Sequence, residues 1–226
     1  MSEVIVLFEG YSNKLDKERM EANCSCVLIK GPKTVIVDTM TAWDKDRIID
    51  ALARHDVEPE DIDFVVCTHG HADHIGNNNL FLKAEHIVGS CVHKGSIFYE
   101  KHLQGAEHQL CEGVKVLRTP GHTYDDVSVI VESTVDAEKV TIAVAGDLFE
   151  KEADLENPEM WQNLGVPELR KTQAENRFLV IMLADYIVPG HGKMFKVTEK
   201  MRRLAEYQIP VDLNESTHAW RNSTIG

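Results

Sequence analysis

Nine short runs of apolar and β-branched residues recur along the chain, and they constrain its fold more than any other feature of the sequence. Turn-forming residues separate the runs, and this arrangement is typical of β-strands. The runs cover residues 4–9, 26–30, 34–38, 63–68, 86–89, 114–119, 126–132, 140–147 and 186–190. A chain with this many short strands has to build sheets, so we expect sheets to form most of its core.

Three longer stretches have helical periodicity: residues 43–57, 165–185 and 196–208. The early strands follow one another through short turns, whereas helices interrupt the later ones. This order fits two sheets with helices packed outside better than a strict alternation of strand and helix. The predicted fold class is therefore a layered α/β or α+β sandwich.

Length and composition indicate one globular unit. A chain of 226 residues with 43% hydrophobic and 27% charged residues is long enough for one well-buried core and short for two. We expect a single domain over residues 1–209 and a polar C-terminal tail over residues 210–226. The acidic, turn-prone stretch 150–159 is predicted to be a surface loop.

The cellular location and the general class of partner follow from simple counts. The N-terminal residues contain only five consecutive apolar residues (4–8), too few for a signal-peptide core or a membrane span. Five irregularly spaced cysteines favour reduced thiols, so we expect a cytosolic protein without membrane contact. The net charge of −13 excludes a general basic footprint, so any binding of nucleic acid must be local.

The segment His-Gly-His-Ala-Asp-His at 69–74 concentrates three of the 11 histidines directly after a predicted strand. In an extended segment, side chains two apart point the same way, so His69 and His71 can bind one metal ion. Asp73 and His74 follow past the turn and are directed to a second site. Imidazole nitrogens and carboxylate oxygens suit Zn²⁺, while iron, manganese or cobalt also fit. A chance surface patch is the alternative, but the pattern is rare enough to favour metal binding.

Three further metal-capable residues lie where predicted strands end. His122 follows a Pro-Gly turn, Asp147 ends the run 140–147, and His191 stands between two glycines. Functional side chains concentrate in such strand-to-loop turns.

The ordered motifs THGHADH, TPGHT, AGD and VPGHG resemble those of the metallo-β-lactamase superfamily of metal-dependent hydrolases. The resemblance covers residues 4–195 and implies a four-layer αββα sandwich that holds two metal ions. By this resemblance the first ion would bind His69, His71 and His122, the second would bind Asp73, His74 and His191, and Asp147 would bridge both. Asp38 matches a family aspartate that orients ligand histidines, although an ordinary strand-ending turn residue is the alternative.

The segments VLFEGYS, VVCTHGHADHIGNNNLF, AGDLFE and IVPGHG resemble, more narrowly, the metallo-β-lactamase domain-containing protein 1 subfamily. That resemblance implies a cytosolic or nuclear enzyme with two Zn²⁺ per chain. It also implies an endoribonuclease activity in mRNA processing, on histone pre-mRNA 3′ ends, and makes a homodimer plausible.

The expected chemistry is hydrolysis. Two divalent cations outweigh the charge of two aspartates, so the pocket favours an anionic or carbonyl substrate. A water between the ions should ionise near neutral pH and attack the scissile bond. Asp73 and Asp147 are the predicted catalytic carboxylates, and Asp147 would also orient the attacking hydroxide.

Candidate substrate contacts come from the basic segment 191–207, which includes Lys193 and Lys196 and could touch phosphates of RNA. A solvated helix face explains the same charges. Tyr124 could line the mouth of the site.

Three other functions stay open. A thioester hydrolase of the glyoxalase II type is weakened because 35 residues after His191 are too few for the glutathione-binding domain. An iron persulfide dioxygenase would use a single ion held by His69, His122 and Asp147. A metal-binding protein without turnover is the third.

Overall fold

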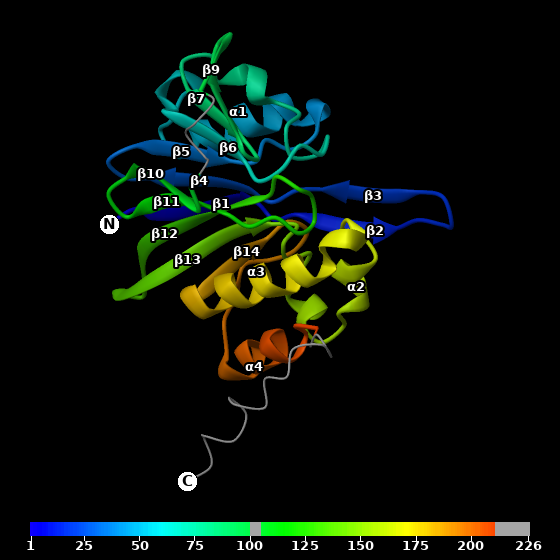
Figure 1. Cartoon of the computed structure of the whole chain (residues 1–226). Coiled ribbons are helices and arrows are strands. Elements are labelled where there is room, and N and C mark those ends of the chain that lie inside the picture. Colours follow the sequence, from blue (N-terminus) through cyan, green and yellow to red (C-terminus); the bar gives the residue numbers. More distant parts are fainter. Residues whose placement is uncertain (100–104, 211–226) are drawn as a thin grey trace.

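The computed structural model describes residues 1–99 and 105–210, and in it two sheets pack face to face between outer helices (Figure 1). The four layers follow from where each strand directs its apolar side chains. Except for its first residue, the predicted tail 210–226 lies outside the described residues.

The first sheet has seven strands and carries α1 (Lys45–Ala53) on its outer face. In spatial order they are β1 (Glu3–Phe8), β4 (Cys26–Lys30), β5 (Thr34–Val37), β6 (Phe64–Cys67), β7 (Glu85–Val88), β8 (Cys91–Lys94) and β9 (Ile97–Phe98). The strands β5, β6 and β7 run parallel, with Ile36 opposite Val65. Buried Ile48 and Leu52 of α1 pack on this sheet, so the amphipathic helix buries its apolar stripe there.

The second sheet has six strands and carries α3 (Arg170–Leu183) and α4 (Glu199–Tyr207) on its outer face. In spatial order they are β10 (Glu107–Cys111), β11 (Val114–Arg118), β12 (Val127–Val135), β13 (Glu138–Gly146), β14 (Tyr186–Pro189) and β15 (Phe195–Lys196). β13 and β14 run parallel, and α3 connects them, which places both strand ends at one edge.

The two faces of β12 show how the sandwich is built. Val127, Val129 and Val131 are buried among side chains of the first sheet, whereas Ile130 packs with Val180 on α3. Residues that alternate along a strand point to opposite faces, so this strand is buried on both sides. The predicted αββα sandwich is confirmed.

A projecting hairpin and several short helices complete the described chain. The hairpin consists of β2 (Tyr11–Lys14) and β3 (Met20–Asn23), which pair only with each other (Figure 1). The helix α2 (Glu159–Gln162) and five 3₁₀ helices lie in connections: Ala42–Asp44, Pro59–Asp61, Asn78–Leu80, Glu152–Leu155 and Pro167–Leu169. In residues 1–99 and 105–210 we find no helix with the length and apolar character needed to cross a bilayer.

The prediction of a surface loop over residues 150–159 is wrong for three of its residues, whereas Glu152 and Ala153 are exposed as expected. Glu150, Asp154 and Leu155 are buried, and Asp154 forms an ion pair with Arg177 of α3. Both carboxylates sit in an acidic, turn-prone stretch, and the buried cation that draws one of them inward lies on a distant helix. Composition alone therefore favoured an exposed loop.

Candidate metal centre

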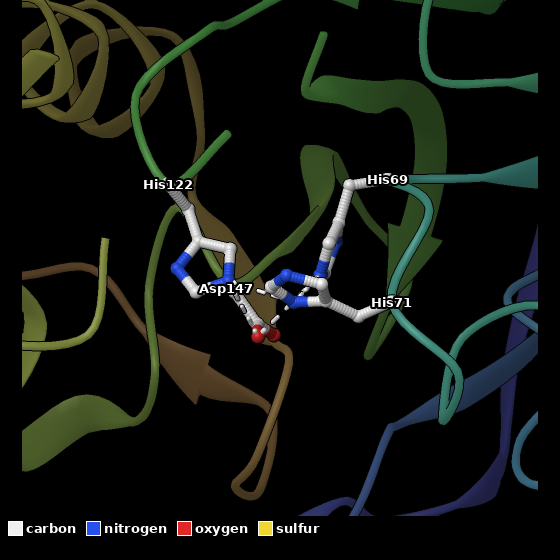
Figure 2. A group of neighbouring side chains, drawn as sticks. All are labelled: His69, His71, His122 and Asp147. Atoms are coloured by element: carbon white, nitrogen blue, oxygen red, sulfur yellow. Dashed lines mark hydrogen bonds and ion pairs between the residues drawn. The ribbon is translucent and has the colours of Figure 1, made fainter. Parts of the chain in front are cut away.

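The predicted site residues lie in loops that follow four strands and meet at one edge of the sandwich. His69 and His71 follow β6, His122 follows β11, Asp147 follows β13, and His191 follows β14. The side chains of four of them point toward one another, although they come from three separate loops (Figure 2). The two sheets thus bring together residues that are up to 122 positions apart.

The first cluster consists of His69, His71, His122 and Asp147 (Figure 2). Nδ1 of His71 lies 2.8 Å from Nε2 of His69 and 3.1 Å from Nε2 of His122. Oδ2 of Asp147 lies 3.4 Å from Nε2 of His122 and 3.7 Å from Nε2 of His69. Tetrahedral zinc with bonds of 2.0–2.1 Å needs ligand atoms about 3.3 Å apart, so the four atoms fit one ion.

The second cluster consists of Asp73, His74 and His191. Oδ2 of Asp73 lies 3.9 Å from Nε2 of each histidine. Asp147 adjoins this cluster as well, with Oδ1 at 3.3 Å from His74 and Oδ2 at 3.1 Å from His191. One buried carboxylate therefore stands between the two clusters.

Buried atoms without partners support a cation at this place. Nε2 of His74 and Oδ1 of Asp147 are buried and have no hydrogen-bond partner among the described residues. A buried polar atom left unpaired costs about 1–3 kcal/mol, which coordination of a metal ion would recover. The donor atoms are nitrogens and carboxylate oxygens, the types that bind divalent transition metals. The residues fit a metal ion in each cluster.

The electrostatics of the first cluster keep its buried histidines in the form that binds a cation. Burial lowers the pKa of His69 and lowers that of His122 to about 4, so both imidazoles are neutral. Burial disfavours the charged form of Asp147, but His74 and His191 outweigh it and hold its pKa well below the ordinary value. The second cluster differs: although burial opposes it, Asp147 raises the pKa of His74 well above its ordinary value and that of His191 to about 9. Because a histidine binds a metal ion in its neutral form, both would release a proton when a metal binds.

Asp38 contacts the second cluster directly. Its Oδ2 lies 2.9 Å from Nδ1 of His74, and its Oδ1 accepts the backbone N–H of Thr68 at 2.7 Å. Asp38 is buried and has a left-handed backbone with φ of +59°, a conformation that few residues other than glycine adopt. An ordinary turn residue makes no such buried side-chain hydrogen bonds, and the contact with Nδ1 fixes the ring orientation of His74.

The three predicted substrate contacts are placed differently. Tyr124 is exposed in the loop after His122, and Lys193 is exposed two residues past His191. Lys196 lies opposite Tyr186, at the start of β14, whereas the metal clusters lie beyond the end of that strand. The structure therefore does not bring Lys196 to the clusters.

Two residues that contact the clusters escaped the sequence analysis. Asn23 accepts a hydrogen bond from Nδ1 of His191 through its backbone carbonyl, at 3.1 Å. Glu150 is buried with Oε1 at 3.9 Å from Nδ1 of His122. A backbone carbonyl can belong to any residue, so the sequence does not indicate the role of Asn23. For Glu150, the available indication is its position three residues after the proposed ligand Asp147.

Comparison with curated proteins gives the same subfamily across species. The chain is 40% identical over 197 residues to metallo-β-lactamase domain-containing protein 1 of Xenopus laevis, with 86% of this chain and 81% of that protein covered. It is 39% identical over 171 residues to the human protein of that name, with 74% and 60% covered. The chain thus spans about three fifths of the human relative.

Solved structures are similar in fold. AiiA of Bacillus thuringiensis with N-decanoyl-L-homoserine bound has a TM-score of 0.59 at 18% identity, covering 84% of this chain and 92% of that one. The chemotaxis sensor ODP, solved as a peroxy diiron species, has a TM-score of 0.61 at 15% identity, covering 93% and 91%. At these identities the likeness concerns the fold alone.

The family model of the metallo-β-lactamase superfamily matches residues 19–191, a range that starts in the hairpin and ends at the last histidine of the second cluster. Fold, clustered donors and sequence likeness agree, and the chain belongs to the metallo-β-lactamase superfamily.

Proposed function

We propose that this protein is a hydrolase that binds two Zn²⁺ ions per chain and cleaves phosphodiester bonds in RNA. The observation that carries the two-ion part is the position of Asp147, whose two oxygens reach histidines of both clusters. When bound, two such ions would polarise the scissile bond and lower the pKa of an attacking water.

Asp147 and Asp73 have different tasks in this proposal. Asp147 is buried and ionised, so it can contact both clusters and can orient an attacking water by accepting a hydrogen bond from it. The side chain of Asp73 is 22% exposed and lies on the solvent side of His74 and His191. It completes the second cluster where substrate enters.

The RNA part rests on the resemblance to the subfamily, and the charged surface gives it limited support. In the basic segment 191–207, Lys200 pairs with Glu156, and Arg202 donates to a main-chain carbonyl after α3 at 3.1 Å. Lys193 is 81% exposed and lies 3.7 Å from an exposed glutamate. Lys193 is the basic residue nearest in sequence to the proposed ligand His191, so contact with a phosphate beside the clusters would depend mainly on it.

A small carbonyl substrate is the second candidate. The net charge of −13 and the ion pairs that Lys193, Lys200 and Arg202 make within the basic segment favour a compact, weakly charged substrate over a long polyanion. An N-acyl homoserine lactonase of a Bacillus species is 29% identical over 102 residues, covering 40% of this chain. Lactones and thioesters are the substrates that test this second candidate.

The substrate test compares both classes under one set of conditions. Zinc-reconstituted protein is incubated with labelled histone pre-mRNA 3′ fragments, an acyl homoserine lactone and a model thioester. The proposal expects cleavage of RNA, and a Lys193→Ala variant should raise KM for RNA with little change in kcat. Cleavage of lactone or thioester without cleavage of RNA would reverse the order of the two candidates.

The single-iron alternative is separated by stoichiometry and by oxygen. One iron per chain and oxygen uptake with a glutathione persulfide would replace the proposed hydrolysis by persulfide oxidation. The three ligands expected for that iron, His69, His122 and Asp147, all lie in the first cluster.

A further inference from the structure

Each histidine of the two clusters has one ring nitrogen directed at the cluster and another directed away from it. A histidine that binds a metal through one nitrogen carries a proton on the other, and that N–H needs an acceptor to fix the ring. For four of the five rings the acceptor is evident. Nδ1 of His74 meets Asp38, Nδ1 of His191 meets the Asn23 carbonyl, and Nδ1 of His69 meets the Thr68 hydroxyl at 3.2 Å. His71 is exposed, so water can serve as the acceptor for its ring.

The fifth ring, that of His122, has no such acceptor. Its Nε2 faces the first cluster, and its Nδ1 is buried without a hydrogen-bond partner among the described residues. The side chain of Glu150 offers an acceptor: its Oε1 lies 3.9 Å from Nδ1, and this oxygen is also buried and has no hydrogen-bond partner among the described residues. One orphaned donor and one orphaned acceptor thus face each other inside the protein.

We infer that Glu150 is the positioning carboxylate of His122, accepting the Nδ1–H so that Nε2 is presented to the metal of the first cluster. This inference rests on the proposed function, because it assumes that the clusters bind metal ions. A hydrogen bond from a ring N–H to an oxygen is about 2.7–3.2 Å long, so the contact closes with a shift of about 1 Å in the Glu150 side chain. Carboxylate partners of this kind raise the basicity of a ligand histidine and set its orientation.

A second, independent set of contacts holds Glu150 behind the cluster. Its backbone N–H donates to Oδ2 of Asp154 at 2.8 Å, and its carbonyl accepts the N–H of His191 at 2.9 Å. Asp154 is locked by Arg177, whose Nη1 donates to Oδ2 at 3.0 Å and to the Leu148 carbonyl at 2.6 Å. The backbone of Glu150 is therefore fixed on both sides, which leaves its carboxylate as the part free to adjust.

The guanidinium of Arg177 is also covered on its faces. It lies 4.2 Å from the ring centre of Phe149 and 4.9 Å from that of Trp161. This packing ties α3 to the residues that follow Asp147. A buried ion pair alone is weak evidence for stability, but one that anchors the backbone beside a metal ligand serves to position it.

The test measures zinc affinity by competition with a chromophoric chelator in wild type, Glu150→Ala, Glu150→Gln and the matched control Glu152→Gln. Glu152 is exposed in the same stretch and has the same charge. Glu150→Ala should weaken zinc binding at the first cluster by about 10- to 100-fold, the usual effect of losing such a partner. Glu150→Gln keeps a carbonyl acceptor and should lose less, and the control should match wild type.

A spectroscopic readout separates positioning from general structural damage. In zinc-loaded wild type, the Nδ1–H of His122 should give a slowly exchanging, downfield imidazole proton in ¹⁵N-edited NMR, and this signal should be absent in Glu150→Ala. Unfolding of the metal-free proteins is followed in parallel. Loss of metal-free stability with unchanged zinc affinity would overturn the inference in favour of a merely structural residue.

Two further outcomes are decisive. Equal losses of zinc affinity in Glu150→Ala and Glu150→Gln would overturn the positioning role. Glutamine keeps a hydrogen-bond acceptor but is a poor metal ligand, so equal losses would mean that Glu150 binds the metal ion directly. Wild type that binds no divalent ion would overturn the proposed function itself. Wild type that binds two ions, with both Glu150 variants unchanged, would overturn only the inference.

Discussion

Oδ2 of Asp38 and Nδ1 of His74 lie 2.9 Å apart, and both side chains are buried. The two residues come from loops after the neighbouring parallel strands β5 and β6. The aspartate can accept a hydrogen bond from the Nδ1–H of His74, so Nε2 of this histidine stays available to a metal ion. This contact joins the fold of the first sheet to the chemistry of the second cluster.

Replacing Asp38 with asparagine should weaken metal binding in the second cluster by about 10- to 100-fold, because an amide can donate to Nδ1 and favour the wrong tautomer. Zinc titration against a chelator measures the change. Asp46→Asn, an exposed aspartate on α1, is the control and should leave affinity unchanged. Undiminished affinity in the Asp38 variant would contradict the orienting role.

Replacing Asp147 with asparagine should lower hydrolysis of the best substrate by about 100-fold or more, because the carboxylate adjoins both clusters and is proposed to orient the attacking water. Metal content should fall in the same variant. Rates are measured on protein reconstituted with excess zinc. A variant that hydrolyses at the wild-type rate would show that the reaction occurs elsewhere on the chain.

Gly190 offers a test of the geometry without changing any proposed ligand. A Cβ atom there would lie 1.8 Å from Oδ1 of Asp147, so Gly190→Ala has to displace that carboxylate. A misplacement of about 1 Å in an active site costs roughly 100-fold in rate. Gly70→Ala is the matched control, because its Cβ would meet no atom within 4 Å although it stands between His69 and His71.

The buried ion pair between Arg177 and Asp154 should matter to stability. Arg177→Met leaves the Asp154 carboxylate buried without its cation, which should reduce the free energy of unfolding by about 3–5 kcal/mol. Lys200→Met removes a solvent-exposed pair and should leave the free energy of unfolding nearly unchanged. Urea unfolding of the metal-free proteins compares the two. Similar losses would mean that the inner pair is not the anchor described above.

The fold could be predicted where burial leaves a continuous apolar signature. All nine predicted runs are strands, because each is buried on at least one face of the sandwich. The hairpin strands Tyr11–Lys14 and Met20–Asn23 were missed because most of their side chains are exposed and polar. Two-stranded pairing of this kind produces no hydrophobic alternation to detect.

In the candidate site, too, the sequence predicts the residues that stand in local motifs and misses those that depend on tertiary contacts. The seven residues proposed as ligands stand in short motifs that the sequence displays openly, and the structure brings all seven together. Asn23 acts through a backbone carbonyl, which any residue could supply. Glu150 depends on Arg177 and Asp154, a tertiary pairing that no local pattern encodes, and an acidic stretch was therefore assigned to the surface.

The metal content of the purified chain tests the central claim most directly. After reconstitution with zinc and removal of excess metal, inductively coupled plasma mass spectrometry should find two zinc ions per wild-type chain. The Asp147→Asn variant should hold fewer. No bound transition metal, or a single iron that zinc does not replace, would contradict a two-metal hydrolase.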